Sequence, residues 1–168
     1  MQQLVLTLIG KDKPGLVEAF SDCLKSQHAN WLASNLSHLA GYFAGIVQIE
    51  VSPEHQAALE QRLAGYPGLA ISVHRVESKT TILPSIQLRF VITGNDRPGI
   101  VHELSTVIRQ SGANIIEFKS SRQSAPNWGL PIFAAEATVS LACEAASQQL
   151  IAALEGLASD IIIDVESA

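Results

Sequence analysis

A short pattern that could bind a charged small molecule occurs twice in this chain of 168 residues, as Gly-x-Asp-x-Pro-Gly beginning at Gly10 and again at Gly94. A short apolar run precedes each copy, and apolar residues at helical spacing follow it, so each copy is predicted to join a strand to a helix. The amides at the start of a helix favour a carboxylate, and a nearby Asp carboxylate could receive an ammonium group. These two poles would suit a free amino acid.

A purely structural explanation of the same pattern is also open. The first glycine would allow backbone angles that a side chain forbids. The Asp would accept hydrogen bonds from the free amides of the first helical turn, and the Pro suits that turn because it lacks an N–H and fixes φ. The second glycine would let a backbone or a ligand approach closely. This explanation accounts less well for glycine on both sides in both copies.

Other residue types that often do chemistry form no convincing site. None of the five histidines has a spacing typical of metal ligands, and the two cysteines, Cys23 and Cys143, are predicted to be buried free thiols. His102 and Ser105 share a helix face, but a polar helix surface explains them better than a base and its nucleophile. No phosphate loop or nucleophile elbow occurs. We therefore expect no enzyme activity, no metal and no cofactor.

The overall charge argues against direct binding to nucleic acid. There are 11 Lys and Arg against 16 Asp and Glu, a net charge of -5, and no basic cluster. A protein partner that itself binds DNA is compatible with this charge. The start of the chain resembles a first strand more than a signal peptide, and no apolar run reaches the roughly 20 residues that span a bilayer. We expect a soluble, cytoplasmic protein that does not enter a membrane.

The chain overlays itself when it is shifted by 84 residues, which indicates an internal duplication. Hydrophobic periodicity predicts the order βαββαβ in each half. The second helix of the first half begins with Ser52 as a good N-cap and Pro53 in the first helical position. This order predicts an α+β fold of two ferredoxin-like domains in tandem. The expected domains are residues 1–77 and 88–168, joined by a linker at residues 78–87.

The two halves differ in the connection between their second and third predicted strands. This connection is longer in the second half, where it reads QSAPNWGLP. Trp128 is expected at or near its tip, where it could contact a partner or ligand or fold back on its own domain; both remain open.

The duplicated order, with DKPGLV at residues 12–17 and DRPGIV at residues 96–101, resembles ACT domains. These are small regulatory modules that bind amino acids, often at interfaces between paired domains. A chain of two such domains is similar to the glycine cleavage system transcriptional repressor family, and the long second hairpin is a weaker likeness to it. The resemblance implies accessory repression of transcription in response to an amino acid such as glycine. It also implies action through a DNA-binding regulator protein.

The resemblance also implies which residues bind the ligand. In the first half they are Lys11, Asp12, Lys13, Pro14, Gly15 and Leu16, and in the second half Asn95, Asp96, Arg97, Pro98, Gly99 and Ile100. Asn30 and Asn114, each expected where the second strand begins, could line the same groove or serve only as helix exits. Because Lys11 and Lys13 replace Asn95 and Arg97, the two sites need not be equivalent.

Two other functions remain open at this stage. One is a constitutive protein-interaction module whose turns bind nothing. The other is a regulatory subunit of an amino-acid metabolic enzyme. Exposed sheet edges can pair between chains, so a homodimer is compatible with every one of these functions.

Overall fold

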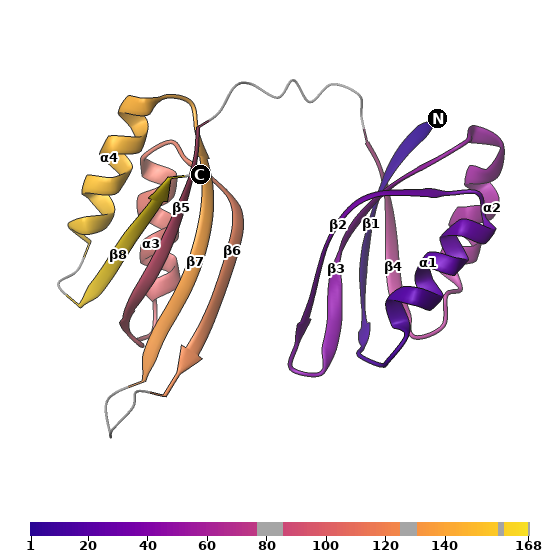
Figure 1. Cartoon of the computed structure of the whole chain (residues 1–168), viewed down its shortest axis with the longest axis horizontal. Helices are drawn as coiled ribbons and strands as arrows, with labels where there is room; N and C mark the ends of the chain where they lie inside the picture. Colours follow the sequence, from indigo (N-terminus) through magenta and orange to yellow (C-terminus); the bar gives the residue numbers. More distant parts are fainter. Residues whose placement is uncertain (77–85, 125–130, 158–159, 168) are drawn as a thin grey trace. The chain divides into compact units, whose positions relative to one another are not determined.

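The computed structural model describes residues 1–76, 86–124, 131–157 and 160–167 (Figure 1). The chain divides into two compact units, Met1–Thr80 and Thr81–Ala168, which are called the first and second unit below. Trp128 and most of the expected linker lie outside the described residues. Within the described part, no helix is long and apolar enough to cross a membrane.

The first unit is a four-stranded antiparallel sheet with both helices on one face (Figure 1). The elements, in chain order, are β1 (Gln2–Lys11), α1 (Leu16–Ser26), β2 (Asn30–Leu39), β3 (Tyr42–Val51), α2 (Pro53–Ala64) and β4 (Leu69–Arg75). The strand order is β2-β3-β1-β4, so β1 is paired on both sides. A two-residue turn at Ala40 and Gly41, both with positive φ, joins β2 to β3.

The second unit repeats this topology, with the strand order β6-β7-β5-β8. Its elements are β5 (Ile86–Asn95), α3 (Ile100–Gln110), β6 (Asn114–Gln123), β7 (Ile132–Leu141), α4 (Glu144–Glu155) and β8 (Ile161–Ser167). The prediction of two ferredoxin-like α+β units is confirmed. β5 begins at Ile86, however, so residues 86 and 87 belong to the strand and not to a linker. Ile86 pairs with Leu141 and packs on the core, which extends the ladder.

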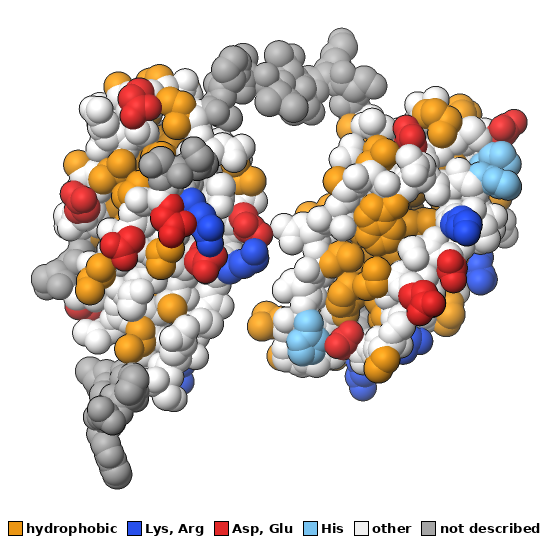
Figure 2. Space-filling model, in the orientation of Figure 1, with side chains coloured by type: hydrophobic (Ala, Val, Ile, Leu, Met, Phe, Trp, Pro, Cys, Tyr) orange, Lys and Arg blue, Asp and Glu red, His pale blue; other side chains and the backbone are white. Residues whose placement is uncertain are grey.

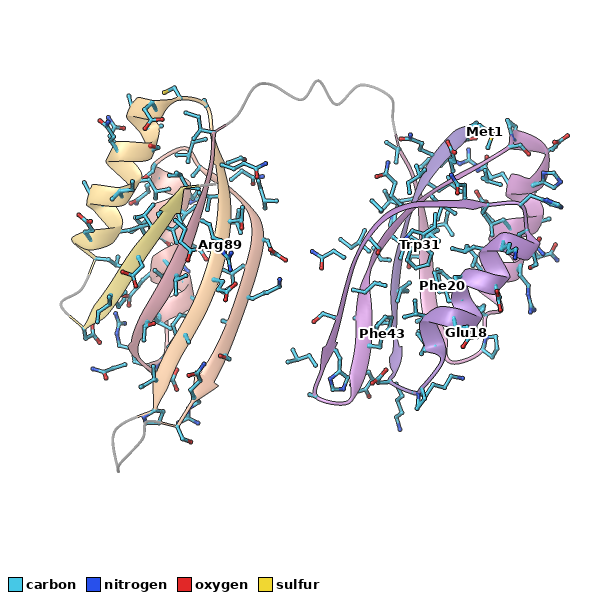
Figure 3. The ribbon with its side chains drawn as sticks, viewed as in Figure 1. Met1, Glu18, Phe20, Trp31, Phe43 and Arg89 are labelled. Atoms are coloured by element: carbon cyan, nitrogen blue, oxygen red, sulfur yellow. The ribbon has the colours of Figure 1, made fainter. Side chains whose placement is uncertain are left out.

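Each unit has its own apolar core between its sheet and its helices. Alternate side chains of β1 point toward the helices, so Leu4, Leu6 and Leu8 are 0–3% exposed. They meet α1, where Phe20 packs edge-on against Trp31 at 5.8 Å between ring centroids (Figure 3). The second core is built in the same way from β5, α3 and α4. This packing holds the first helix of each unit against the sheet and so positions the turn that joins it to the preceding strand.

Two local predictions need correction. Cys23 is buried as predicted, but Cys143 is exposed. Cys143 is the extended residue before α4 and does not lie on the apolar face of that helix. Ser52 precedes α2 and Pro53 begins it, as predicted. The Ser52 side chain bonds no backbone amide, however; its hydroxyl lies 2.8 Å from Nδ1 of His55.

Candidate ligand-binding site

The two Gly-x-Asp-x-Pro-Gly segments form turns of the same backbone shape. Each turn leads from one of the two central strands of its sheet into the first helix of its unit. Gly15 and Gly99 precede α1 and α3 in the left-handed conformation, with φ of 77° and 93°. An L-residue with a side chain is disfavoured there, because its Cβ approaches the following carbonyl. The second glycine of each segment therefore sets the backbone angle that starts the helix.

The first glycine of each segment has a different role. Gly10 lies in β1, where a Cβ would stand 2.1 Å from the carbonyl oxygen of Gly68. A Cβ on Gly94 would stand 2.9 Å from the carbonyl oxygen of Asp160. A Cβ on Gly15 or Gly99 would meet only a Glu side-chain oxygen, at 3.9 Å or 3.8 Å. The predicted roles are thus exchanged: the first glycine permits close approach and the second permits an unusual angle.

The predicted capping by the Asp carboxylates is wrong. The cap residue of α1 and of α3 is a glycine, which has no side chain, and neither Asp accepts a hydrogen bond from a helix amide among the described residues. Asp12 Oδ2 instead lies 3.7 Å from Nε2 of His38, and Asp96 Oδ2 lies 2.8 Å from Nε of Arg122. Each Asp therefore faces the neighbouring hairpin and not the helix.

The backbone fastens the turns to the same hairpins. The Asp12 N–H donates to the Gly41 carbonyl at 3.0 Å, and the Asp96 N–H donates to the Pro131 carbonyl at 2.8 Å. The position of each turn is therefore set by its hairpin as well as by its central strand.

The amides at the start of each helix are available to an anion. The N–H groups of Val17 and Glu18 have no backbone acceptor among the described residues, and the same holds for Val101 and His102. Helix starts of this kind attract negative groups because the amides and the helix dipole both favour them. Either turn could thus accept a carboxylate as far as its backbone is concerned.

The side chains make the second turn very different from the first. Arg97 donates from Nη1 and Nη2 to the two carboxylate oxygens of Glu103, at 2.6 Å each. Its Nε lies 3.8 Å from Oδ2 of Asp160. The hydrogen bond with Glu103 raises the pKa of Arg97, and the same bond lowers the pKa of Glu103. The guanidinium is therefore held by the protein's own carboxylates.

In the first turn, Lys13 stands where the second has Arg97. The positions that match Glu103 and Asp160 hold Ala19 and Gly68, neither of which carries a charge. Within the described residues, Lys11 and Lys13 form no ion pair, and both are exposed. This turn presents cations that other parts of the protein do not neutralise.

Asn30 and Asn114 lie far from the turns, contrary to the expectation that they could line the same groove. Asn30 pairs with Glu50, which pairs with Gln3 at the start of β1, whereas the turn follows Lys11 at its end. Eight residues of strand separate these ends, about 26 Å. Asn114 has the matching place in the second sheet. The reason is that α1 and α3 run back along the sheet, so the next strand begins at the opposite end.

The face of the second sheet away from its helices contains a hollow of about 480 Å³. Short side chains in one cross-strand row, Ser121, Ala134 and Thr93, form its floor beside the longer Lys119 and Glu136. Strand alternation could have predicted which side chains share this face, but the hollow depends on the register between strands.

Ion pairs continue across the same face of the second sheet. Arg89 lies 2.8 Å from Glu136 and 3.5 Å from Glu166, on the side of the sheet opposite the helices (Figure 3). Figure 2 shows acidic and basic side chains gathered over these strands. In the described part of the chain, no group of three or more His, Cys, Asp or Glu side chains could hold a metal ion.

Residues 2–71, nearly all of the first unit, match the family model of the ACT domain. The first unit is the part of the chain that this model matches, and it is called the ACT domain below. The second unit repeats the topology of this ACT domain strand for strand. The ACT fold is a regulatory one, and ACT domains bind small amino acids.

Two solved structures share the fold over the whole length of the chain. A crystal structure of an unknown protein from Galdieria sulphuraria is 29% identical, with 99% of this chain and 98% of that chain covered and a TM-score of 0.83. The crystal structure of a putative glycine cleavage system transcriptional repressor is 17% identical, with the same coverage and a TM-score of 0.72. No curated protein matches the chain in sequence. The likeness to these solved structures therefore extends over both units and is not limited to the ACT domain.

Proposed function

We propose that this protein is an amino-acid-responsive regulator that acts through a protein partner. The observation that carries the proposal is the strand-to-helix turn of the ACT domain. It places unbonded helix amides beside Lys13, a cation without an ion pair among the described residues. The carboxylate of a free amino acid would accept hydrogen bonds from these amides, and the ammonium group would face Glu18, whose Oε2 would stand 3.9 Å from a Cβ on Gly15.

The more specific role that we propose is accessory repression of the glycine cleavage system through a DNA-binding regulator. The support is the shared tandem fold with a protein described as a putative glycine cleavage system transcriptional repressor. The net charge of -5 suits a protein that contacts such a regulator and not DNA itself. Glycine is the first ligand to test on this basis.

A second candidate function, constitutive protein interaction, is favoured by one surface of the ACT domain. Its sheet face away from the helices carries Ile9, Leu39, Tyr42 and Ile46, which are 49–77% exposed. Apolar side chains gathered on one face mark protein contacts more often than isolated ones do. In this case the partner would bind with or without an amino acid.

Thermal unfolding against a panel of amino acids tests the proposal. A ligand that binds only the folded state stabilises it by about 2.7 kcal/mol at a hundredfold excess over its dissociation constant. We expect a higher midpoint with glycine, and a much smaller shift in Lys13→Met, which keeps the length of the side chain and removes its charge. Lys25→Met, in the last turn of α1, is the matched control.

The outcomes separate the candidates. A shift with a different amino acid keeps the regulator and replaces its ligand. No shift with any amino acid at millimolar concentration favours the constitutive module. Purification of the native protein with its partners then separates a DNA-binding regulator from an amino-acid metabolic enzyme.

A further inference from the structure

Arg97 and Glu103 are joined in the geometry with which an arginine binds a free carboxylate. The two parallel N–H donors of the guanidinium meet the two carboxylate oxygens, at 2.6 Å each. This fork is the arrangement that makes Arg a specific ligand for planar anions. Both side chains are about one third exposed, at 33% and 39%. The pair therefore lies where a small molecule from solvent would reach it.

The carboxylate of Glu103 also lies over the start of α3. Glu103 is in the first turn, where its N–H donates to the Gly99 carbonyl at 3.0 Å. Its Oε1 would stand 3.8 Å from a Cβ built on Gly99. The carboxylate therefore lies beside the turn, where it pairs with the cation that the turn supplies.

The first turn has the same backbone without such an ion pair, although Glu18 Oε2 would stand 3.9 Å from a Cβ built on Gly15. Ala19 stands at the position of Glu103, and Gly68 stands where the second unit has Asp160. Glu18 is one residue earlier on α1, and Lys13 forms no ion pair with it or with any other described residue. A carboxylate ligand could therefore bind Lys13 without displacing another carboxylate from it.

We infer that the Glu103 carboxylate is a built-in occupant of Arg97 that closes the second turn to carboxylate ligands, so that the first turn is the ligand site. This inference rests on the proposed function and assigns its ligand to one of two similar turns. A free carboxylate can bind Arg97 only by displacing an anion that is already tethered to the same helix, and tethering gives that anion a high effective concentration. The raised pKa of Arg97 and the lowered pKa of Glu103 agree with a firm pair.

Glu103→Gln in the full chain tests the inference, because the amide keeps the size of the side chain and removes its charge. The probes are acetate, which has only a carboxylate, and glycine. Amide NMR titration reads the two turns separately. We expect wild type to respond at residues 15–18 alone. We expect Glu103→Gln to respond at residues 99–102 as well, with binding at the second turn at least about tenfold tighter than in wild type.

Three further variants serve as controls for this test. Glu144→Gln changes an acid in the first turn of α4 of the same unit, and it should leave both turns as in wild type. Glu103→Ala removes the carboxylate altogether and replaces the glutamine variant if that variant unfolds. In Glu103→Gln combined with Lys13→Met, binding should remain only at the second turn.

The inference and the proposed function fail in different ways. Equal acetate response of wild type and Glu103→Gln at residues 99–102, with glycine bound at the first turn, overturns the inference and keeps the proposed function. Wild-type binding at the second turn as tight as at the first also overturns the inference. If Glu103→Gln gains acetate binding but wild type binds no amino acid, the result supports the role of Glu103 as an occupant of Arg97 and contradicts the proposed function.

Discussion

The two turns share a backbone and differ in how their charges are used. Gly15 and Gly99 take the same left-handed conformation, and both Asp N–H groups bond to the neighbouring hairpin. Arg97 is held by Glu103 in the second turn, whereas Lys13 has no ion pair among the described residues in the first. The two copies therefore share the glycine conformation and the backbone hydrogen bond that shape the turn. Their charged side chains differ, and among the described residues only the first copy has a cation without an ion pair.

The sheet faces away from the helices differ in the same manner. In one cross-strand row, Lys119 and Glu136 of the second unit stand where the ACT domain has Asn35 and Ile46. The second face carries ion pairs and a hollow, and the first carries exposed apolar side chains. An apolar face suits contact with a protein, which agrees with a division of tasks between the units.

The largest expected difference between the units concerns the first glycine of each turn. Gly10→Ala should destabilise the ACT domain by about 3 kcal/mol, because its Cβ meets the Gly68 carbonyl and the strands must separate. Gly94→Ala should cost the second unit only about 1 kcal/mol, because the contact with Asp160 is 0.8 Å longer, at 2.9 Å against 2.1 Å. Urea unfolding followed by NMR signals of each unit measures both changes.

Gly65→Ala is the matched control for this pair. Gly65 ends α2 with φ of −103° and would place its Cβ in open space, so the change should be nearly neutral. Equal losses for Gly10→Ala and Gly94→Ala would show that the close approach in β1 does not limit the substitution.

A smaller difference is expected where the first helix of each unit ends. Gly112 after α3 and His28 after α1 hold the same left-handed position, with φ of 71° and 57°. Gly112→Ala should lower the stability of the second unit by about 1 kcal/mol, whereas His28→Gly should raise that of the ACT domain by about 0.5 kcal/mol. Calorimetric unfolding of the variants measures both. A stabilised Gly112→Ala would refute this account of the helix ends.

The smallest expected difference is a pH dependence of the unfolding free energy that arises in the second unit alone. The pKa of Glu103 is lowered by its hydrogen bond with Arg97, so the pair stabilises the folded state above the unfolded pKa of Glu, about 4.3. This contribution is lost as the pH falls through the lower, folded pKa. The gap in unfolding free energy between wild type and Glu103→Gln should therefore be steady from pH 7 to about pH 5 and shrink below about 4.3. A gap that stays constant in acid would contradict the ion pair.

The fold followed from patterns that are local in the sequence. Alternation at Leu4, Leu6 and Leu8 predicted a half-buried strand, helical spacing at Phe20 and Leu24 predicted α1, and the duplication carried both to the second unit. These patterns report burial directly, because side chains alternate along a strand and recur every three or four residues in a helix.

The side-chain roles at the turns did not follow, because they depend on residues far away in the sequence. The role of Gly10 is set by the Gly68 carbonyl just before β4, and Asp12, which was predicted to cap α1, lies beside His38 of β2. Glu103 alone reads as an ordinary helix-surface acid. The overlay that matches it with Ala19, and Arg97 with Lys13, was the signal that could have identified it. The ligand-binding roles of the turn residues remain predictions.

Each turn follows a strand that has a neighbour on both sides, and this limits how a unit can unfold locally. β1 is hydrogen-bonded to β3 on one side and to β4 on the other, as β5 is to β7 and β8. Sheets fray from their edges, and amides in a strand flanked on both sides exchange with solvent only after a neighbour has left. Because β4 and β8 are edge strands, their opening exposes only those amides of β1 and β5 that face them, and the amides bonded to β3 and β7 stay protected. The strand side of each turn thus keeps one hydrogen-bonded neighbour when that edge opens.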